Sequence, residues 1–196
     1  MGTATLADGQ FRCVLCATEM VLGDEAVRAI FEQALALAER VARVRPARIP
    51  HLRIVGRREM GEVRRRFASE IPTGTGSHHV LGFFVRERGA ASIYVELGMP
   101  RPLLLGTLAH ELGHAWQVEA APDLVDPLQR EGFAEWVAHR VLVAGGYRRV
   151  AARATRRDDV YGRGLRYFLA VERTHGARTV LDVVRGNRPQ SIANSG

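Results

Sequence analysis

The stretch His110-Glu111-Leu112-Gly113-His114 constrains this chain more than any other, because it has the form H-E-x-x-H. Residues four apart lie on the same face of a helix, so both imidazoles are expected to reach one metal ion. A bound zinc ion lowers the pKa of water to about 7, and a glutamate beside it can act as general base. The motif therefore predicts His110 and His114 as zinc ligands and Glu111 as a catalytic residue.

Residues 102–120 are expected to form the helix that carries this motif. Pro102 suits a first helical turn, and apolar residues follow on nearly every face, which is typical of a buried helix. Polar groups inside such a helix need partners, and a metal ion would satisfy both imidazoles. The alternative is a pair of hydrogen-bonded core histidines, but it leaves Glu111 without a role.

A catalytic zinc ion needs a third protein ligand and an open fourth position. Asp126-Pro127 is typical of a helix N-terminus, and the helix that follows carries Glu131 and Glu135 on one face. Two carboxylates at this spacing repel each other. The repulsion is relieved if one carboxylate binds a metal ion and the other accepts a hydrogen bond from an imidazole N–H. We predict Glu131 as the third ligand and Glu135 as the acceptor that orients His110. An exposed acidic face is the alternative, and the apolar neighbours of both residues disfavour it.

The composition excludes several classes of protein. The 196 residues suffice for one domain with a buried core, and no apolar run is long enough to span a bilayer, so no membrane partner is expected. No signal or lipidation pattern opens the chain, which favours a cytoplasmic location. All 28 basic residues are arginine, which excludes a lysine nucleophile and is typical of a GC-rich bacterial genome. The net charge of +7 is spread among glutamates, which favours a solvated basic surface over nucleic-acid binding.

Cys13 and Cys16 are the only cysteine pair, and they have the spacing of half a zinc knuckle. No second C-x-x-C follows them. We therefore expect a vestigial knuckle in an N-terminal segment, residues 1–22. A structural zinc site completed by another segment or chain is one alternative, and redox use is another.

The rest of the chain is expected to form one α+β domain over residues 23–186, followed by a flexible tail at 187–196. Asp24 is expected to cap the first helix. The strands expected from their apolar and β-branched residues are 49–55, 80–86 and 91–97. The last two should form a hairpin that packs on the motif helix. The strand just before that helix, 91–97, is expected to bind a peptide by strand addition.

A later helix carries two glycines in its first turn. Asp158 and Asp159 are expected to cap this helix, which begins near Tyr161 and contains Gly162 and Gly164. Each glycine weakens a helix by about 1 kcal/mol, and close approach to another element is the usual compensation. Beside such a contact, Tyr161 could reach the metal site.

Three segments resemble the DA-one-like metallopeptidase domain, which is the C-terminal part of the plant LIM-domain peptidases that ubiquitin activates. The segments are 94–116, 131–133 and 161–166, where Leu165 replaces an aromatic residue of the family. The resemblance covers most of residues 11–186. It implies a zincin-like fold of the gluzincin type, one catalytic zinc ion and protein or peptide substrates. The acidic ubiquitin-interacting motifs of the plant proteins are absent, so dependence on ubiquitin is not expected.

A more distant similarity concerns zinc aminopeptidases. Residues 131–134, Glu-Gly-Phe-Ala, and the pattern Tyr161-x-x-Gly164 are similar to their motifs, in which the Glu binds zinc and the Tyr stabilises the oxyanion. The similarity implies that Tyr161 is a second catalytic residue. The predicted function is thus a zinc metallopeptidase that hydrolyses peptide bonds. Two alternatives stay open: a DNA-associated metalloprotease and a non-catalytic, zinc-stabilised protein-binding module.

Overall fold

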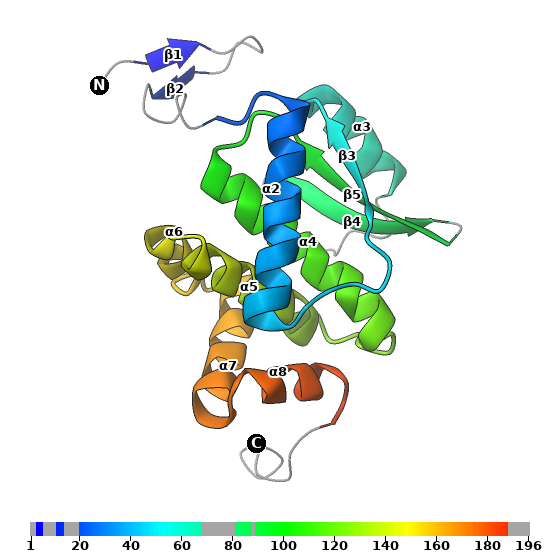
Figure 1. Ribbon diagram of the computed structural model, residues 1–196, viewed down its shortest axis with the longest axis vertical. Coiled ribbons are helices and arrows are strands. Elements are labelled where there is room, and N and C mark those ends of the chain that lie inside the picture. Colours follow the sequence, from blue (N-terminus) through cyan, green and yellow to red (C-terminus); the bar gives the residue numbers. More distant parts are fainter. Residues whose placement is uncertain (1–2, 6–10, 14–19, 68–80, 88, 188–196) are drawn as a thin grey trace.

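The fold is α+β, with a small sheet and its flanking helices in one half of the molecule and helices alone in the other (Figure 1). The computed structural model describes residues 3–5, 11–13, 20–67, 81–87 and 89–187. The helices are α2 (Asp24–Leu37), continued by the π-helical η1 (Ala38–Ala42), α3 (Arg57–Arg66), α4 (Arg101–Ala120), α5 (Pro127–Ala144), α6 (Arg148–Ala154), α7 (Val160–His175) and α8 (Ala177–Val184). The strands are β1 (Thr3–Thr5), β2 (Phe11–Cys13), β3 (His51–Val55), β4 (Gly82–Glu87) and β5 (Ala90–Glu96). None of the helices in the described ranges is long and apolar enough to cross a membrane.

The main sheet has the strand order β3-β5-β4. β5 pairs parallel with β3 and antiparallel with β4, where Gly82 lies opposite Val95 and Glu87 opposite Ala90. The predicted hairpin is confirmed. The prediction that residues 91–97 accept a peptide strand is wrong, because β3 and β4 take up the hydrogen-bonding groups on both edges of β5. The edge strand of the hairpin is β4 instead.

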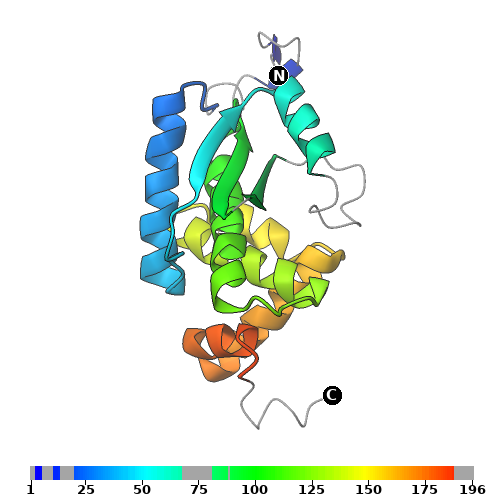
Figure 2. The same ribbon diagram turned by 90° about the vertical axis from the view of Figure 1, so that its right-hand side faces the viewer.

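The two faces of this sheet pack on different helices (Figure 2). Ile93 and Val95 of β5 join the main core with α2, α4 and α5. Phe83 and Val85 of β4 point the other way and form a small second core with Met60 of α3. This alternation follows from the period of two along a strand. It leaves the intervening residue, Phe84, on the side of α4.

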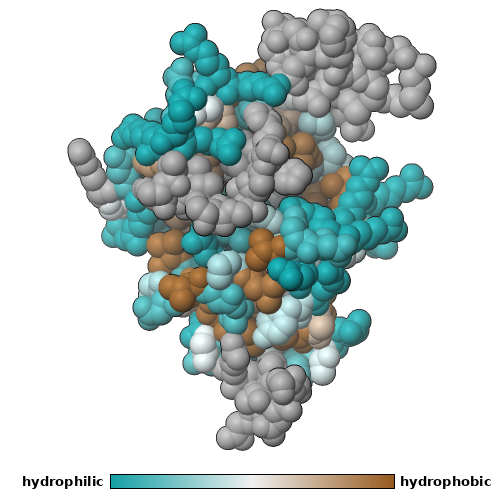
Figure 3. Space-filling view, turned by 180° about the vertical axis from the view of Figure 1, so that it is seen from behind, coloured by the Kyte–Doolittle hydropathy of each residue, from teal (hydrophilic) through white to brown (hydrophobic). Residues whose placement is uncertain are grey.

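α4 is buried because apolar residues occupy nearly all of its faces, as the sequence predicts. Leu104, Leu108 and Leu112 are at most 1% exposed, and among the large apolar side chains of α4 only Leu103 in the first turn is exposed, at 41%. The helix packs against α2, α5 and β4, so the H-E-x-x-H segment lies between the sheet and the other helices (Figure 1). Hydrophilic residues cover most of the described surface seen in Figure 3, with smaller apolar patches between them.

Side-chain caps begin the two helices that follow α4 in the candidate site. The carboxylate of Asp126 accepts from the N–H of Leu128, and that of Asp159 accepts from the N–H of Gly162 at 3.0 Å. Both caps agree with the sequence prediction. Asp24, in contrast, does not cap α2; it lies inside the first turn, where an acidic residue favours the helix dipole.

Two further predictions concern the ends of the chain. Cys13 ends β2, which pairs with β1, while Cys16 lies outside the described residues. The predicted tail also lies outside them from residue 188 onwards. The short helix α6 was not predicted, because its residues are rich in arginine and carry no clear apolar period.

Candidate metal centre

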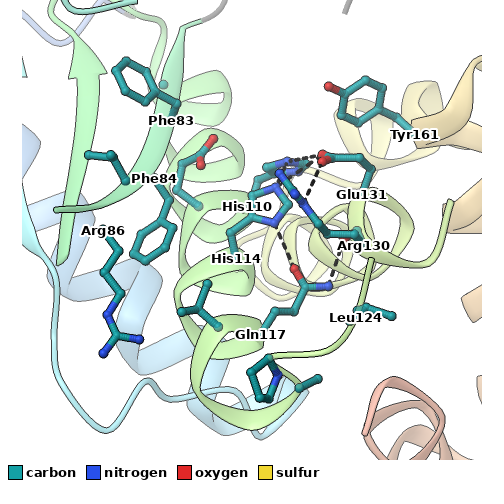
Figure 4. Close-up of a pocket in the computed structure, with 16 residues that line it drawn as sticks. Phe83, Phe84, Arg86, His110, His114, Gln117, Leu124, Arg130, Glu131 and Tyr161 are labelled. Atoms are coloured by element: carbon teal, nitrogen blue, oxygen red, sulfur yellow. Dashed lines mark hydrogen bonds and ion pairs between the residues drawn. The ribbon is translucent and has the colours of Figure 1, made fainter. Parts of the chain in front are cut away.

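Two helices bring the three predicted ligands together (Figure 4). His110 and His114 come from α4 and Glu131 from α5, and their ligand atoms all lie within 4.8 Å of one another. The two Nε2 atoms are 3.1 Å apart, and Oε2 of Glu131 lies 3.4 Å from Nε2 of His110 and 3.3 Å from that of His114. A tetrahedral zinc ion with bonds of about 2.0–2.1 Å separates its ligand atoms by about 3.3–3.4 Å. The three atoms therefore have the spacing of ligands around one ion.

The surroundings of Glu131 also fit a cation. This side chain is 2% exposed, and its Oε1 is buried without a hydrogen-bond partner. Nε of Arg130 lies 3.5 Å from Oε1, which is an ion-pair distance. A carboxylate buried in this way needs positive charge beside it. Two imidazoles and one carboxylate are also the donor set of known catalytic zinc sites.

The pKa values of His110 and Glu131 are both shifted by the attraction between the imidazoles and the carboxylates. Burial alone would lower the pKa of His110, but the hydrogen bond to Glu131 and the charges of Glu111 and Glu135 raise it to about 9. Burial alone would raise the pKa of Glu131, but hydrogen bonds from His110 and His114 bring it far below its usual range. The negative charge of Glu131 thus draws a positive charge to the space between the three side chains.

Glu111 lies in the same pocket and is 6% exposed. Burial raises its pKa, and the charges of His110 and His114 oppose this shift only in part. A backbone hydrogen bond links Glu111 to Phe84, so the edge strand β4 adjoins this carboxylate. A carboxyl group with a raised pKa beside a candidate metal centre is suited to proton transfer.

A pocket of about 290 Å³ opens over the cluster. In Figure 4, β4 with the side chain of Phe84 forms one wall, and Tyr161 and Leu124 lie across the pocket from it. The polar end contains the candidate ligands and Glu111. The apolar end is lined by Phe84, Val118, Ala121, Pro122 and Leu124. The space leaves room for water and for an elongated ligand next to the three ligand atoms.

Tyr161 reaches this pocket from the first turn of α7. Its ring centroid lies 6.0 Å from that of His110, and the guanidinium of Arg157 lies 4.7 Å from the same tyrosine ring. Burial raises the pKa of Tyr161, and the charge of Glu131 raises it further, so the phenol keeps its proton at neutral pH. A protonated phenol at this position can donate a hydrogen bond into the pocket.

Glu135 lies one turn after Glu131 on α5, on the far side of the His110 ring from the ligand cluster. Its Oε1 is 3.7 Å from Nδ1 of His110 and 3.4 Å from Nη1 of Arg157. The first distance is that of an ion pair and is longer than a hydrogen bond of about 2.7–3.2 Å. The carboxylate is thus near the atom that it was predicted to orient, and it is shared with a guanidinium.

Gln117 was missed by sequence reasoning. This side chain is 4% exposed, and its Oε1 lies 2.9 Å from Nδ1 of His114. Its Nε2 donates to the backbone carbonyl of Arg130, also at 2.9 Å. The available signal was a polar residue one turn after His114 on a helix that is otherwise apolar there.

Comparisons of the chain with protein-family models, curated proteins and solved structures found no match. The resemblance to the DA-one-like domain therefore remains a prediction from three sequence motifs. Two of these motifs, 131–133 and 161–166, contribute Glu131 and Tyr161 to the same pocket.

Proposed function

We propose that this protein is a zinc metallopeptidase with a zincin-like fold of the gluzincin type. The observation that carries the proposal is the spacing of 3.1–3.4 Å among the three ligand atoms of His110, His114 and Glu131, beside the carboxylate of Glu111 in an open pocket. Two histidines and a carboxylate would hold the ion, and the pocket leaves a fourth position open. When bound there, zinc would supply a Lewis acid that acidifies water and polarises a carbonyl group.

The chain's own residues would carry the proton transfers. Glu111 takes a proton from the water whose oxygen attacks the carbonyl carbon of the peptide. It then gives this proton to the amine nitrogen as the C–N bond breaks. Its raised pKa suits both roles, because the group must accept a proton in one step and release it in the next.

Substrate binding is assigned to the walls of the pocket. β4 has β5 as its only strand neighbour in the described part of the chain, and β4 adjoins Glu111 through Phe84. An extended peptide can add to such an edge and bring its backbone beside the general base. Tyr161, with its protonated phenol, donates a hydrogen bond to the carbonyl oxygen as negative charge develops on it.

The two alternatives have less support. Several arginines of the described surface pair with carboxylates, as Arg66 does with Glu87 at 3.0 Å and Arg157 with Asp159 at 2.6 Å. These pairs offset part of the positive charge of the surface, which gives a DNA-binding face less support. A purely structural zinc site would be closed by a fourth protein ligand, whereas this cluster adjoins a pocket of about 290 Å³.

Metal content and turnover test the proposal together. Native mass spectrometry of the purified protein should find one zinc ion per chain. Casein hydrolysis should stop when a chelator removes the ion and return when zinc is added back, while added magnesium should not restore it. A protein that cleaves casein equally well without metal would contradict the proposal.

A further inference from the structure

Gln117 connects the two helices of the candidate metal centre. Figure 4 shows its side chain between His114 on α4 and Arg130 on α5, with a hydrogen bond to each. Both donor–acceptor distances are 2.9 Å, and the side chain is 4% exposed. Water has little access to such an amide, so these two bonds account for its burial.

The partner on α5 determines which way the amide points. The backbone carbonyl of Arg130 can only accept a hydrogen bond, so the NH₂ group of Gln117 must face it. The amide oxygen must then face His114. An amide oxygen can only accept, so Nδ1 of His114 must carry a proton and donate it. Through the amide of Gln117, the backbone carbonyl of Arg130 thus determines that the proton of His114 is on Nδ1.

We propose that Gln117 is a positioning residue that fixes the proton of His114 on Nδ1 and so presents the lone pair of Nε2 to the metal ion. Nε2 of His114 is the atom that lies 3.3 Å from Oε2 of Glu131. A neutral imidazole binds a metal ion through its unprotonated nitrogen, and the bond made by the other nitrogen selects that form. The inference deepens the proposed function, because it rests on the same zinc site.

The same bridge ties the third ligand to the second. Arg130, whose carbonyl accepts from Gln117, immediately precedes Glu131 in α5. The hydrogen bond therefore holds the backbone that carries Glu131 at a fixed distance from the His114 ring. His110 has a different neighbour at Nδ1, the carboxylate of Glu135 at an ion-pair distance of 3.7 Å, so the two rings face a neutral amide and a charged carboxylate respectively.

Two variants separate the roles of the hydrogen bonds that Gln117 makes to His114 and to Arg130. In Gln117→Met the side chain has a similar length, and both hydrogen bonds are lost. Gln117→Glu keeps an acceptor for His114 and loses the donor to Arg130. Glu119→Met serves as the matched control, because Glu119 also joins α4 to another segment, through the N–H groups of Ala47 and Arg48, without touching the metal cluster.

The first readout is the zinc dissociation constant, measured by competition with a chromogenic chelator. Loss of a group that orients a ligand typically weakens metal binding by about 10–100-fold. Gln117→Met should fall in this range, Gln117→Glu should lose less because it keeps the acceptor for His114, and Glu119→Met should stay within about threefold of the parent. Equal losses in Gln117→Met and Glu119→Met would overturn the inference, since zinc affinity would then follow general stability.

The second readout is the imidazole proton itself. In the cobalt-substituted protein, the N–H of each ligating histidine gives a shifted proton NMR signal that exchanges with water. In Gln117→Met the proton that gives one of these signals should exchange with water much faster. In Gln117→Glu its exchange should be slow again, as in the parent. Unchanged signals and unchanged zinc affinity in Gln117→Met would overturn the role of Gln117 alone. A parent protein that binds neither zinc nor cobalt would overturn the metal centre as well.

Discussion

Gly132 of α5 and Gly164 of α7 lie against each other: a Cβ atom added to Gly132 would be 2.4 Å from Cα of Gly164. The reverse substitution would bring a Cβ atom within 2.5 Å of Cα of Gly132 and 2.4 Å of the carbonyl oxygen of Leu128. The two helices therefore touch through their backbones at this point. The contact adjoins Glu131 in sequence and brings Tyr161, one turn earlier on α7, to the pocket.

This contact leads to a prediction for Gly164→Ala. Because the neighbouring atoms are backbone, α7 must move away from α5, and overpacking of this kind typically costs about 1–3 kcal/mol. Chemical denaturation should show that loss, and zinc affinity should fall as Glu131 shifts. Gly61→Ala is the control, since its nearest atom is the end of the Arg65 side chain at 3.9 Å, and it should leave stability equal or higher. Equal stability of both variants would contradict the account of the contact.

The N-cap of α7 is expected to stabilise the fold in a pH-dependent way. Burial alone would raise the pKa of Asp159, but the Gly162 N–H and the Arg157 guanidinium lower it below its usual value. A carboxyl group whose pKa is lower in the folded state contributes its full stabilisation of the fold at pH values above its unfolded pKa of about 4. This contribution is lost as the pH falls through the pKa of the folded state. Asp159→Ala should therefore cost about 1 kcal/mol at pH 7 and less below pH 4.

Thermal unfolding at several pH values measures this difference. Asp158→Ala is the control, because the Asp158 carboxylate is 98% exposed and lies 3.7 Å from its nearest guanidinium, that of Arg166. The control should stay close to the parent at every pH. A gap between Asp159→Ala and the parent that does not change with pH would contradict the ionic part of the cap.

Metal binding should distinguish Glu131 from Glu135. Glu131→Ala removes a proposed ligand atom, so native mass spectrometry should find almost no zinc on this variant. Glu135→Gln keeps the three ligands and weakens only the orientation of His110, so it should retain the ion with an affinity lower by about 10-fold or more. Full zinc occupancy in Glu131→Ala would transfer the role of third ligand to another residue.

Local parts of the fold and site could be predicted from the sequence. The spacing of His110 and His114 determines their common helical face, and the caps at Asp126 and Asp159 depend on neighbouring residues only. The hairpin of β4 and β5 also depends on a short connection. The approach of α7 to α5 was inferred from the two glycines that would otherwise weaken α7.

Long-range contacts explain what could not be predicted. The parallel pairing of β3 with β5 joins strands that are far apart in the chain, and it makes β4 rather than β5 the edge next to the site. The role of Gln117 depends on where the carbonyl of Arg130 lies, and only the packing of α4 on α5 determines that position. A helical pattern alone marks Gln117 as a polar residue in a buried stretch and does not reveal its partners.

Tyr161→Phe should affect the chemical step more than binding. A phenol that donates to the developing oxyanion acts mainly in the transition state, so kcat should fall by about 100-fold while KM and zinc content barely move. Tyr167→Phe is the control, since this ring packs on Phe168 in the core. A kcat for Tyr161→Phe within twofold of the parent would remove Tyr161 from the catalytic residues.

The zinc content and casein turnover of Glu111→Gln test the central claim most directly. The amide keeps the shape of the side chain but cannot take a proton from water. We predict one zinc ion per chain, as in the parent, and a turnover lower by about 10²–10⁴-fold, the range of general base catalysis. A variant that binds zinc normally and cleaves casein at the parental rate would contradict the proposed metallopeptidase mechanism.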